Sequence, residues 1–177
     1  MTASPTAAES PIPPTIEWVG GDTLATAGEG AHVELIDQRL LPGELTVVEA
    51  RPIPELCEYI ATLAVRGAPA LGAAGAMGVA LAATLGLDLD DAAATVKATR
   101  PTAVNLGWGV DMAMAADDPV AEAVRLAADD VARNMALGGH GAELVPGGAR
   151  VLTHCYAGAR ACVGWGTALR VIRSAHE

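Results

Sequence analysis

Apolar and polar residues alternate in two short stretches near the start of the chain. These stretches, Ile16–Trp18 and His32–Asp37, have the period of two that predicts β-strands. The residues at 20–22 read Gly-Gly-Asp, which favours a turn after the first strand. The pattern therefore predicts a small sheet at the N-terminal end, ahead of a long stretch with helical spacing.

The first helix is predicted by apolar residues that recur three and four positions apart. They are Leu56, Tyr59, Ile60 and Leu63. Gly67 is expected to end this helix, and proline at position 69 can begin the next one because it fits the first turn of a helix. The second predicted helix runs over 69–85.

This second helix carries a run of small residues over which another helix can approach closely: Gly72, Gly75, Ala76 and Gly78. The surrounding segment, 67–87, has no charged residue and is long enough to span a bilayer. It consists mostly of Ala and Gly, which drive membrane insertion weakly. We therefore expect a buried core helix here and no membrane span.

Three more helices are predicted, each with a start signal. Asp88 can cap a helix through Thr99, and Pro101 can begin a helix that runs to about Ala115. Asp118 and the proline after it begin a helix with the apolar residues Val120, Val124, Leu126, Val131 and Met135. The sequence leaves two C-terminal ends possible for this last helix. Gly-Gly at 138–139 can stop it, but an apolar pattern resumes over 142–145.

A change of architecture is predicted at Pro-Gly-Gly, residues 146–148. The chain from Val151 reads as one strand, a turn containing Gly158 and a helix up to Glu177. A lone strand of this kind lacks the partners that a parallel sheet needs, so we expect an unpaired edge and a truncated unit.

The expected fold class is α/β overall. Residues 1–14, rich in Pro, Ser, Thr and Ala, predict a disordered tail without the features of a targeting peptide. A mainly helical N-terminal domain with short strands follows over 15–146. Residues 147–177 are expected to form the first β-α unit of a truncated Rossmann-like domain.

Charge and cysteine content limit the classes of function that the chain can have. The 177 residues carry 21 acidic and 11 basic side chains, a net charge of -10, so no basic face for nucleic acid can be assembled. Three cysteines, an odd number, in a chain with no predicted secretory signal favour reduced thiols and a cytoplasmic protein.

Two arginines stand next to predicted helix starts. Arg66 and Gly67 precede one helix, where unpaired N–H groups and the helix dipole attract anions, and Ala68 is the next residue in the chain. Arg100 has the same relation to the proline-started helix after it. Together they predict a phosphate site; each taken alone is also compatible with an exposed arginine near an ordinary helix end.

Cys155 is the best candidate for a reactive thiol, because it would follow a buried strand at the mouth of a turn. The alternative is a buried structural cysteine, which Cys57 and Cys162 fit better because both lie in predicted helices. His154 would face away from Cys155 on a strand and is expected in the core or behind the site. No cysteine spacing indicates zinc.

Three blocks carry a resemblance to a known family: RGAPALG from residue 66, RPTAVNL from residue 100, and LTHC from residue 152 with GTAL from residue 166. DQRLLP from residue 37 also fits. Together they resemble the methylthioribose-1-phosphate isomerases, within the superfamily of initiation factor two-B-like proteins. The resemblance covers nearly the whole chain and about the first half of a family member.

The resemblance implies an aldose-ketose isomerase of methionine salvage. It would convert 5-methylthioribose 1-phosphate into 5-methylthioribulose 1-phosphate without an organic cofactor or metal, and its full-length form would be a homodimer. Arg66, Gly67, Ala68 and Arg100 would contact the substrate phosphate. Cys155 would be the catalytic cysteine, acting as a base or as a stabiliser of the transition state.

The resemblance also implies an impaired chain. The family's catalytic aspartate, in a later Gly-Ala-Asp segment, lies beyond Glu177, so we expect little or no activity. Tyr156 stands where the family has asparagine, and Arg170 where it has glycine. Two alternatives stay open: a non-catalytic sugar-phosphate or nucleotide-binding module related to regulatory subunits of initiation factor two-B, and an isomerase of ribose 1,5-bisphosphate.

Overall fold

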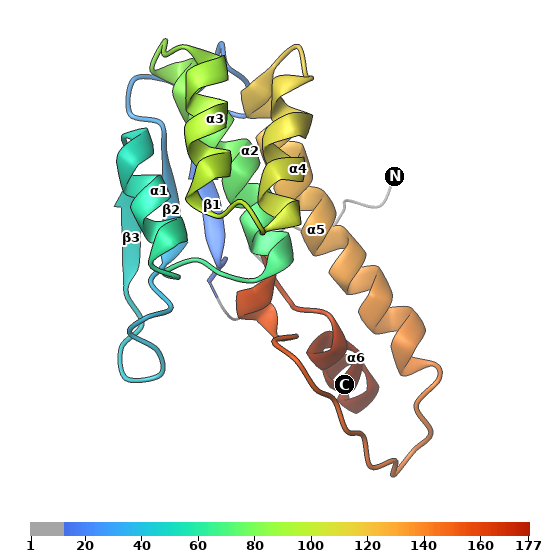
Figure 1. The fold of residues 1–177 in the computed structure, drawn as a ribbon. Coiled ribbons are helices and arrows are strands. Elements are labelled where there is room, and N and C mark those ends of the chain that lie inside the picture. The colour runs from blue at the N-terminus through green and yellow to red at the C-terminus, as the bar shows by residue number, and fades with distance from the viewer. Residues whose placement is uncertain (1–12) are drawn as a thin grey trace.

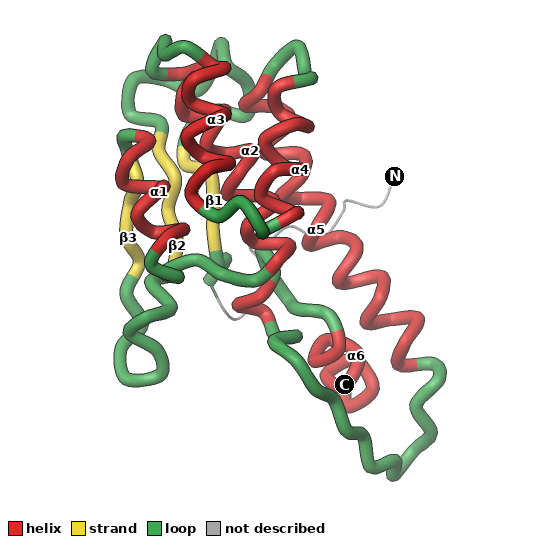
Figure 2. Tube along the Cα trace, viewed as in Figure 1, coloured by secondary structure: helices red, strands yellow, loops and turns green. Residues whose placement is uncertain are grey.

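The computed structural model describes residues 13–177, and the expected N-terminal tail lies almost entirely outside this range. A small sheet comes first in the chain and helices follow it (Figures 1 and 2). The elements are β1 (Ile16–Val19), β2 (His32–Ile36), β3 (Val47–Ala50), α1 (Ile53–Ala61), α2 (Ala68–Thr84), α3 (Leu89–Thr99), α4 (Val104–Met114), α5 (Pro119–Ala142), the 3-10 turn η2 (Ala159–Ala161) and α6 (Ala168–His176).

The three strands form one antiparallel sheet in the order β1-β2-β3. In register, Val33 of β2 lies opposite Trp18 of β1 and Ala50 of β3, and all three side chains point into the core. The alternation of buried and exposed residues in β1 confirms the first predicted strand, and β2 confirms the second. The sequence pattern missed β3, whose first three residues are not buried.

Helix α2 forms the centre of the molecule. Every residue from Ala70 to Ala82 is buried, and α2 packs against α1, α3, α4 and α5. The small residues allow this, since a Cβ at Gly75 would lie 2.4 Å from the carbonyl oxygen of Leu106 in α4. The predicted core helix is confirmed. Within the described residues, no helix combines the length and the apolar character needed to cross a membrane.

The structure decides between the two C-terminal ends that the sequence allowed for helix α5. It runs without a break from Pro119 to Ala142, so the glycines at 138 and 139 lie inside it. Asp118 caps it as expected, accepting hydrogen bonds from the N–H groups of Val120 and Ala121 at 3.0 Å. The long helix extends beyond the other helices and gives the C-terminal segment a surface on which to pack (Figure 1).

The C-terminal segment corrects two predictions. No strand forms at 151–154, so there is neither a parallel β-α unit nor an unpaired sheet edge. The helix expected after Gly158 begins only at Ala168, and a short 3-10 turn takes the earlier positions. A strand is stable only when its backbone N–H and C=O groups are hydrogen-bonded to a neighbouring strand. Within residues 13–177, no strand pairs with 151–154.

The α4 start is a smaller correction. Proline at 101 was expected to begin the helix, but α4 begins at Val104, because Pro101 and Thr102 form a turn and Ala103 has ψ 86°, outside the helical range. The N–H of Ala103 closes this turn by donating to the carbonyl oxygen of Arg100 at 2.9 Å. The fold is of the mixed α/β type expected; its division at residues 146/147 stays a prediction.

Candidate active site

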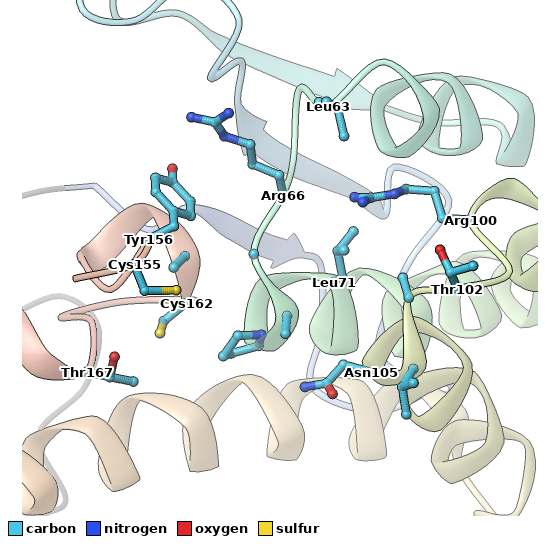
Figure 3. Close-up of a pocket in the computed structure, with 16 residues that line it drawn as sticks. Leu63, Arg66, Leu71, Arg100, Thr102, Asn105, Cys155, Tyr156, Cys162 and Thr167 are labelled. Carbon is cyan, nitrogen blue, oxygen red and sulfur yellow. The ribbon is translucent and has the colours of Figure 1, made fainter.

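One cavity of about 680 Å³ lies where the loop before α2, the start of α4 and the C-terminal segment meet. Figure 3 shows its lining, with Arg66 and Arg100 entering from different sides and the two thiols on the side of the C-terminal segment. The lining residues are Leu63, Arg66, Gly67, Ala68, Pro69, Leu71, Arg100, Thr102, Ala103, Val104, Asn105, Cys155, Tyr156, Ala161, Cys162 and Thr167. All five residues that the sequence singled out are among them.

Gly67 fixes the shape of this cavity beside α2. Its φ of +95° is accessible to glycine and strained for other residues, and a Cβ there would lie 2.4 Å from the carbonyl oxygen of Ala161. The glycine was expected to make room for a ligand; the structure shows that its close neighbour is the backbone of the C-terminal segment. It thereby brings Arg66 and the thiol-bearing loop together.

Both arginines leave their guanidinium groups available to a ligand. Arg66 is exposed, and its guanidinium carbon lies 4.6 Å from the centre of the Tyr156 ring. Arg100 is half-buried at the end of α3. Within residues 13–177, neither guanidinium forms an ion pair or a hydrogen bond with another side chain. The five N–H donors of each can therefore bind an anion.

The electrostatics of the cavity oppose those of the chain as a whole. The chain carries a net charge of -10, yet no Asp or Glu lines this cavity. The starts of α2, α4 and α6 all contribute lining residues, namely Ala68, Val104 and Thr167. Helix starts have unpaired N–H groups and partial positive charge, so the cavity attracts anions.

Cys155 is exposed and has φ +96°, one of the few non-glycine residues of the described chain with a positive value. Such an angle is strained for a residue with a Cβ, and strain of this kind concentrates at functional positions. The thiol lines the cavity although the strand expected to carry it does not form.

Cys162 differs from Cys155 although both line the cavity. It is fully buried, and burial together with the nearby carboxylate of Asp130 raises the pKa of its thiol to about 12, so the thiol stays protonated at neutral pH. It was expected inside a helix; instead it follows the turn η2. Cys57 lies in α1, as predicted, and is half-buried.

Sequence reasoning misjudged one neighbour of the thiol and missed several others. His154 is exposed and does not line the cavity, so its expected place in the core was wrong, because no strand turns its side chain inward. Tyr156, Cys162 and Thr167 were not expected to line the site. Their positions depend on the irregular loop between α5 and α6, for which the residue pattern contained no signal.

The fold and the cavity define a class: a helical body with a small antiparallel sheet and an anion-attracting site with an exposed thiol. The sequence profile of the Initiation factor 2 subunit family matches residues 64–177, and the chain belongs to this family. Within it, the chain resembles methylthioribose-1-phosphate isomerases, as the sequence blocks predicted.

Relatives that bear that name include enzymes of two bacteria. The methylthioribose-1-phosphate isomerase of Parasynechococcus marenigrum is 46% identical over 174 residues, which cover 93% of this chain and 49% of the relative. That of Geobacter metallireducens is 45% identical over 185 residues, covering 92% of this chain and 51% of the relative. The chain thus spans about half the length of the curated relatives it matches.

Solved structures share the fold as well. The 5-methylthioribose 1-phosphate isomerase of Pyrococcus horikoshii matches with a TM-score of 0.80 and 34% identity, over 99% of this chain and 53% of that one. The translation initiation factor eIF-2B, subunit delta, of A. fulgidus matches with a TM-score of 0.76 and 43% identity, over 93% and 51%.

Proposed function

We propose that this chain supplies the phosphate-binding part and the catalytic thiol of an aldose-ketose isomerase of methionine salvage. The substrate is 5-methylthioribose 1-phosphate and the product is 5-methylthioribulose 1-phosphate. The observation that carries the proposal is that Arg66, Arg100 and Cys155 all line one cavity. The names of the relatives and of the Pyrococcus horikoshii structure support it.

The cavity offers what a sugar phosphate requires. The phosphate is a dianion, and two planar guanidinium groups and helix starts surround a space free of carboxylates. The phosphate contacts proposed are Arg66, Gly67, Ala68 and Arg100. Binding the phosphate at a fixed point orients the two sugar carbons between which hydrogen must move, and this orientation lowers the barrier of the reaction.

Cys155 is the proposed catalytic residue, acting on a proton at the reacting carbons or stabilising charge there. An isomerisation of this kind needs a second acid-base group, and none of the cavity-lining residues is a carboxylate. We therefore propose that these 177 residues bind the substrate and convert it only slowly. The second acid-base group would come from a segment that corresponds to the C-terminal half of the relatives, which this chain does not match.

Titration calorimetry with 5-methylthioribose 1-phosphate tests the binding step. Replacing Arg66→Gln or Arg100→Gln is expected to weaken binding by about tenfold or more, because each removes charge-assisted hydrogen bonds worth ~1.5–3 kcal/mol. Arg51→Gln is the matched control, since Arg51 pairs with Glu49 and does not line the cavity. Equal affinities in all four proteins would contradict the proposal.

A turnover assay tests the second step. The 177-residue chain is expected to isomerise the substrate far more slowly than the full-length Geobacter metallireducens relative assayed in parallel, and Cys155→Ala is expected to remove the residual activity without weakening binding. Turnover comparable with that of the relative would show that the described cavity is sufficient and would refute the slow-conversion proposal.

A second candidate is favoured by the match to the structure named as subunit delta of eIF-2B. In this case the cavity binds a sugar phosphate or nucleotide as a recognition site and performs no chemistry. Retained ligand binding without turnover, even when the C-terminal half of the Geobacter metallireducens relative is added, would favour this non-catalytic module over the isomerase.

A further inference from the structure

Gln38 links three segments that are far apart in the sequence. Its side chain is almost fully buried, with 6% of the residue exposed. Its backbone N–H donates to the carbonyl oxygen of Ala64, just before Arg66, and its amide Nε2 donates to the carbonyl oxygen of Arg160, both at 3.0 Å. Its Oε1 accepts a hydrogen bond from the hydroxyl of Tyr156.

The Tyr156 ring continues this chain of contacts into the cavity. The guanidinium group of Arg66, a proposed phosphate contact, lies over the ring at 4.6 Å. The Tyr156 side chain therefore contacts both Gln38 and Arg66. Figure 3 shows Tyr156 next to Cys155 and facing Arg66. Gln38 itself is not among the residues that line the cavity.

The backbone at Cys155 needs such a support. Its φ of +96° is unfavourable for a residue with a Cβ, and such an angle persists only when surrounding contacts impose it. Cys155 has no side-chain hydrogen bond among those found in residues 13–177, and it is exposed. The next residue, Tyr156, is attached through its hydroxyl to a buried amide.

We propose that Gln38 and Tyr156 are positioning residues for the site. The hydrogen bond between them, called here the Gln38–Tyr156 pair, holds the thiol of Cys155 at a fixed place relative to the guanidinium group of Arg66. The pair acts on the site through Cys155 and Arg66. The inference rests on the proposed function for its effect on ligand binding, and on geometry alone for its effect on the thiol.

The variant Tyr156→Phe isolates the hydrogen bond because it keeps the ring under Arg66. Its matched control is Tyr59→Phe, which removes the hydroxyl of the other tyrosine, whose ring lies 6.0 Å from the guanidinium of Arg39 and outside the cavity. Two properties are measured: the affinity for 5-methylthioribose 1-phosphate by calorimetry, and the rate at which iodoacetamide alkylates Cys155, followed by peptide mass spectrometry.

Tyr156→Phe is expected to weaken binding about fivefold, the effect of one lost hydrogen bond, and to raise the alkylation rate at least about twofold, because the turn is released. Tyr156→Leu also removes the ring and is expected to weaken binding by a further factor of about three. Tyr59→Phe is expected to change neither property. A purely structural role would instead lower the unfolding midpoint and leave the affinity of the folded chain unchanged.

The two measurements separate this inference from the proposed function. If the unmodified chain binds the sugar phosphate, and Tyr156→Phe matches it in both affinity and alkylation rate, the positioning role is wrong and the function stands. If the unmodified chain does not bind the sugar phosphate but Tyr156→Phe still alkylates faster than Tyr59→Phe, the function is wrong and the positioning of the thiol stands. If the unmodified chain does not bind the sugar phosphate and Tyr156→Phe is alkylated no faster than Tyr59→Phe, both the function and the positioning role are overturned.

Discussion

The body of the molecule, residues 13–142, and the C-terminal segment, residues 143–177, are stabilised in different ways. In the body, α2 is buried over thirteen successive residues, Ala70–Ala82, and regular helices and strands pair the backbone (Figure 2). In the C-terminal segment, η2 and α6 are the regular elements, and Leu144 and Leu152 are 84% and 96% exposed. Apolar burial dominates in the first region and contributes less in the second.

Besides the contact of α6 with α5, the C-terminal segment is held by single hydrogen bonds to distant parts of the body. The N–H of Thr15 donates to Val163 at 2.9 Å, the N–H of Val163 donates to Asp130 at 2.8 Å, and the Asn134 amide donates to Gly164 at 3.1 Å. The body supplies the arginines of the cavity and the segment supplies its thiol. The site is therefore assembled from a tightly packed half and a half that depends on the α5–α6 contact and a few polar contacts.

The largest expected effect comes from the close approach of α2 and α4. At Gly109 of α4, a Cβ would lie 1.9 Å from the carbonyl oxygen of Gly72 in α2, so Gly109→Ala forces two backbones apart. We expect the free energy of unfolding to fall by about 3 kcal/mol, measured by urea denaturation, with loss of the body and the segment together.

Gly107→Ala is the matched control in the same helix, because a Cβ there meets nothing within 4 Å. Alanine is the better helix former, so this variant is expected to gain up to ~1 kcal/mol. Equal losses at both positions would mean that α4 is sensitive to any substitution, and that the distinction between a tightly packed body and a loosely held segment is unfounded.

A smaller and more local effect is expected at the contact between α5 and α6. A Cβ at Gly138 would lie 2.5 Å from Cγ of Arg170 and 2.8 Å from Oγ of Ser174, and these side chains can move. Gly138→Ala is expected to cost about 1–2 kcal/mol, confined to the segment. Hydrogen exchange should show faster amides in α6 and unchanged amides in α2. The adjacent Gly139→Ala, where a Cβ meets nothing within 4 Å, should not speed exchange in either helix.

The same contrast explains what the sequence could predict. Local signals located the body: the alternation in β1 and β2, the Ala-Gly pattern of α2, and the capping residues Asp88 and Asp118, which accept the expected backbone hydrogen bonds. These signals depend on neighbours in sequence. Strand β3 was missed because it is short and only its last residue is buried, so it shows no alternation. It is a strand because its backbone pairs with β2.

The cavity was predictable in part for a related reason. Arg66 and Arg100 stand at helix boundaries that the sequence marks, whereas Tyr156 acquires its place from Gln38, 118 positions away. No periodicity connects two such residues. The strand expected at 151–154 failed likewise, because an apolar run is equally compatible with an irregular segment when no sheet lies beside it.

The smallest expected effect concerns Asp118, where α5 begins within the body. Its carboxylate accepts hydrogen bonds from the N–H groups of Ala121, Leu24 and Val120, and these bonds lower the pKa of the carboxyl. Asp118→Ala is expected to cost about 1 kcal/mol at pH 7, measured by urea denaturation, while Asp117→Ala, an exposed neighbour, should cost almost nothing. A cost at residue 117 equal to that at 118 would exclude the cap as the cause.

The pH dependence of Asp118 provides a further check. Because its pKa is lowered by folding, the stabilisation is fully present above the ordinary value of 3.8 and is lost as the pH falls through the folded value. The difference between Asp118→Ala and the unmodified chain should therefore be constant from pH 7 to 5 and shrink below pH 3.8. Asp118→Asn keeps an acceptor oxygen without a titrating group, so it should stay close to the unmodified chain at pH 7 and retain its cap in acid. If its loss in acid matched that of the unmodified chain, other carboxylates would control the acid sensitivity of the body.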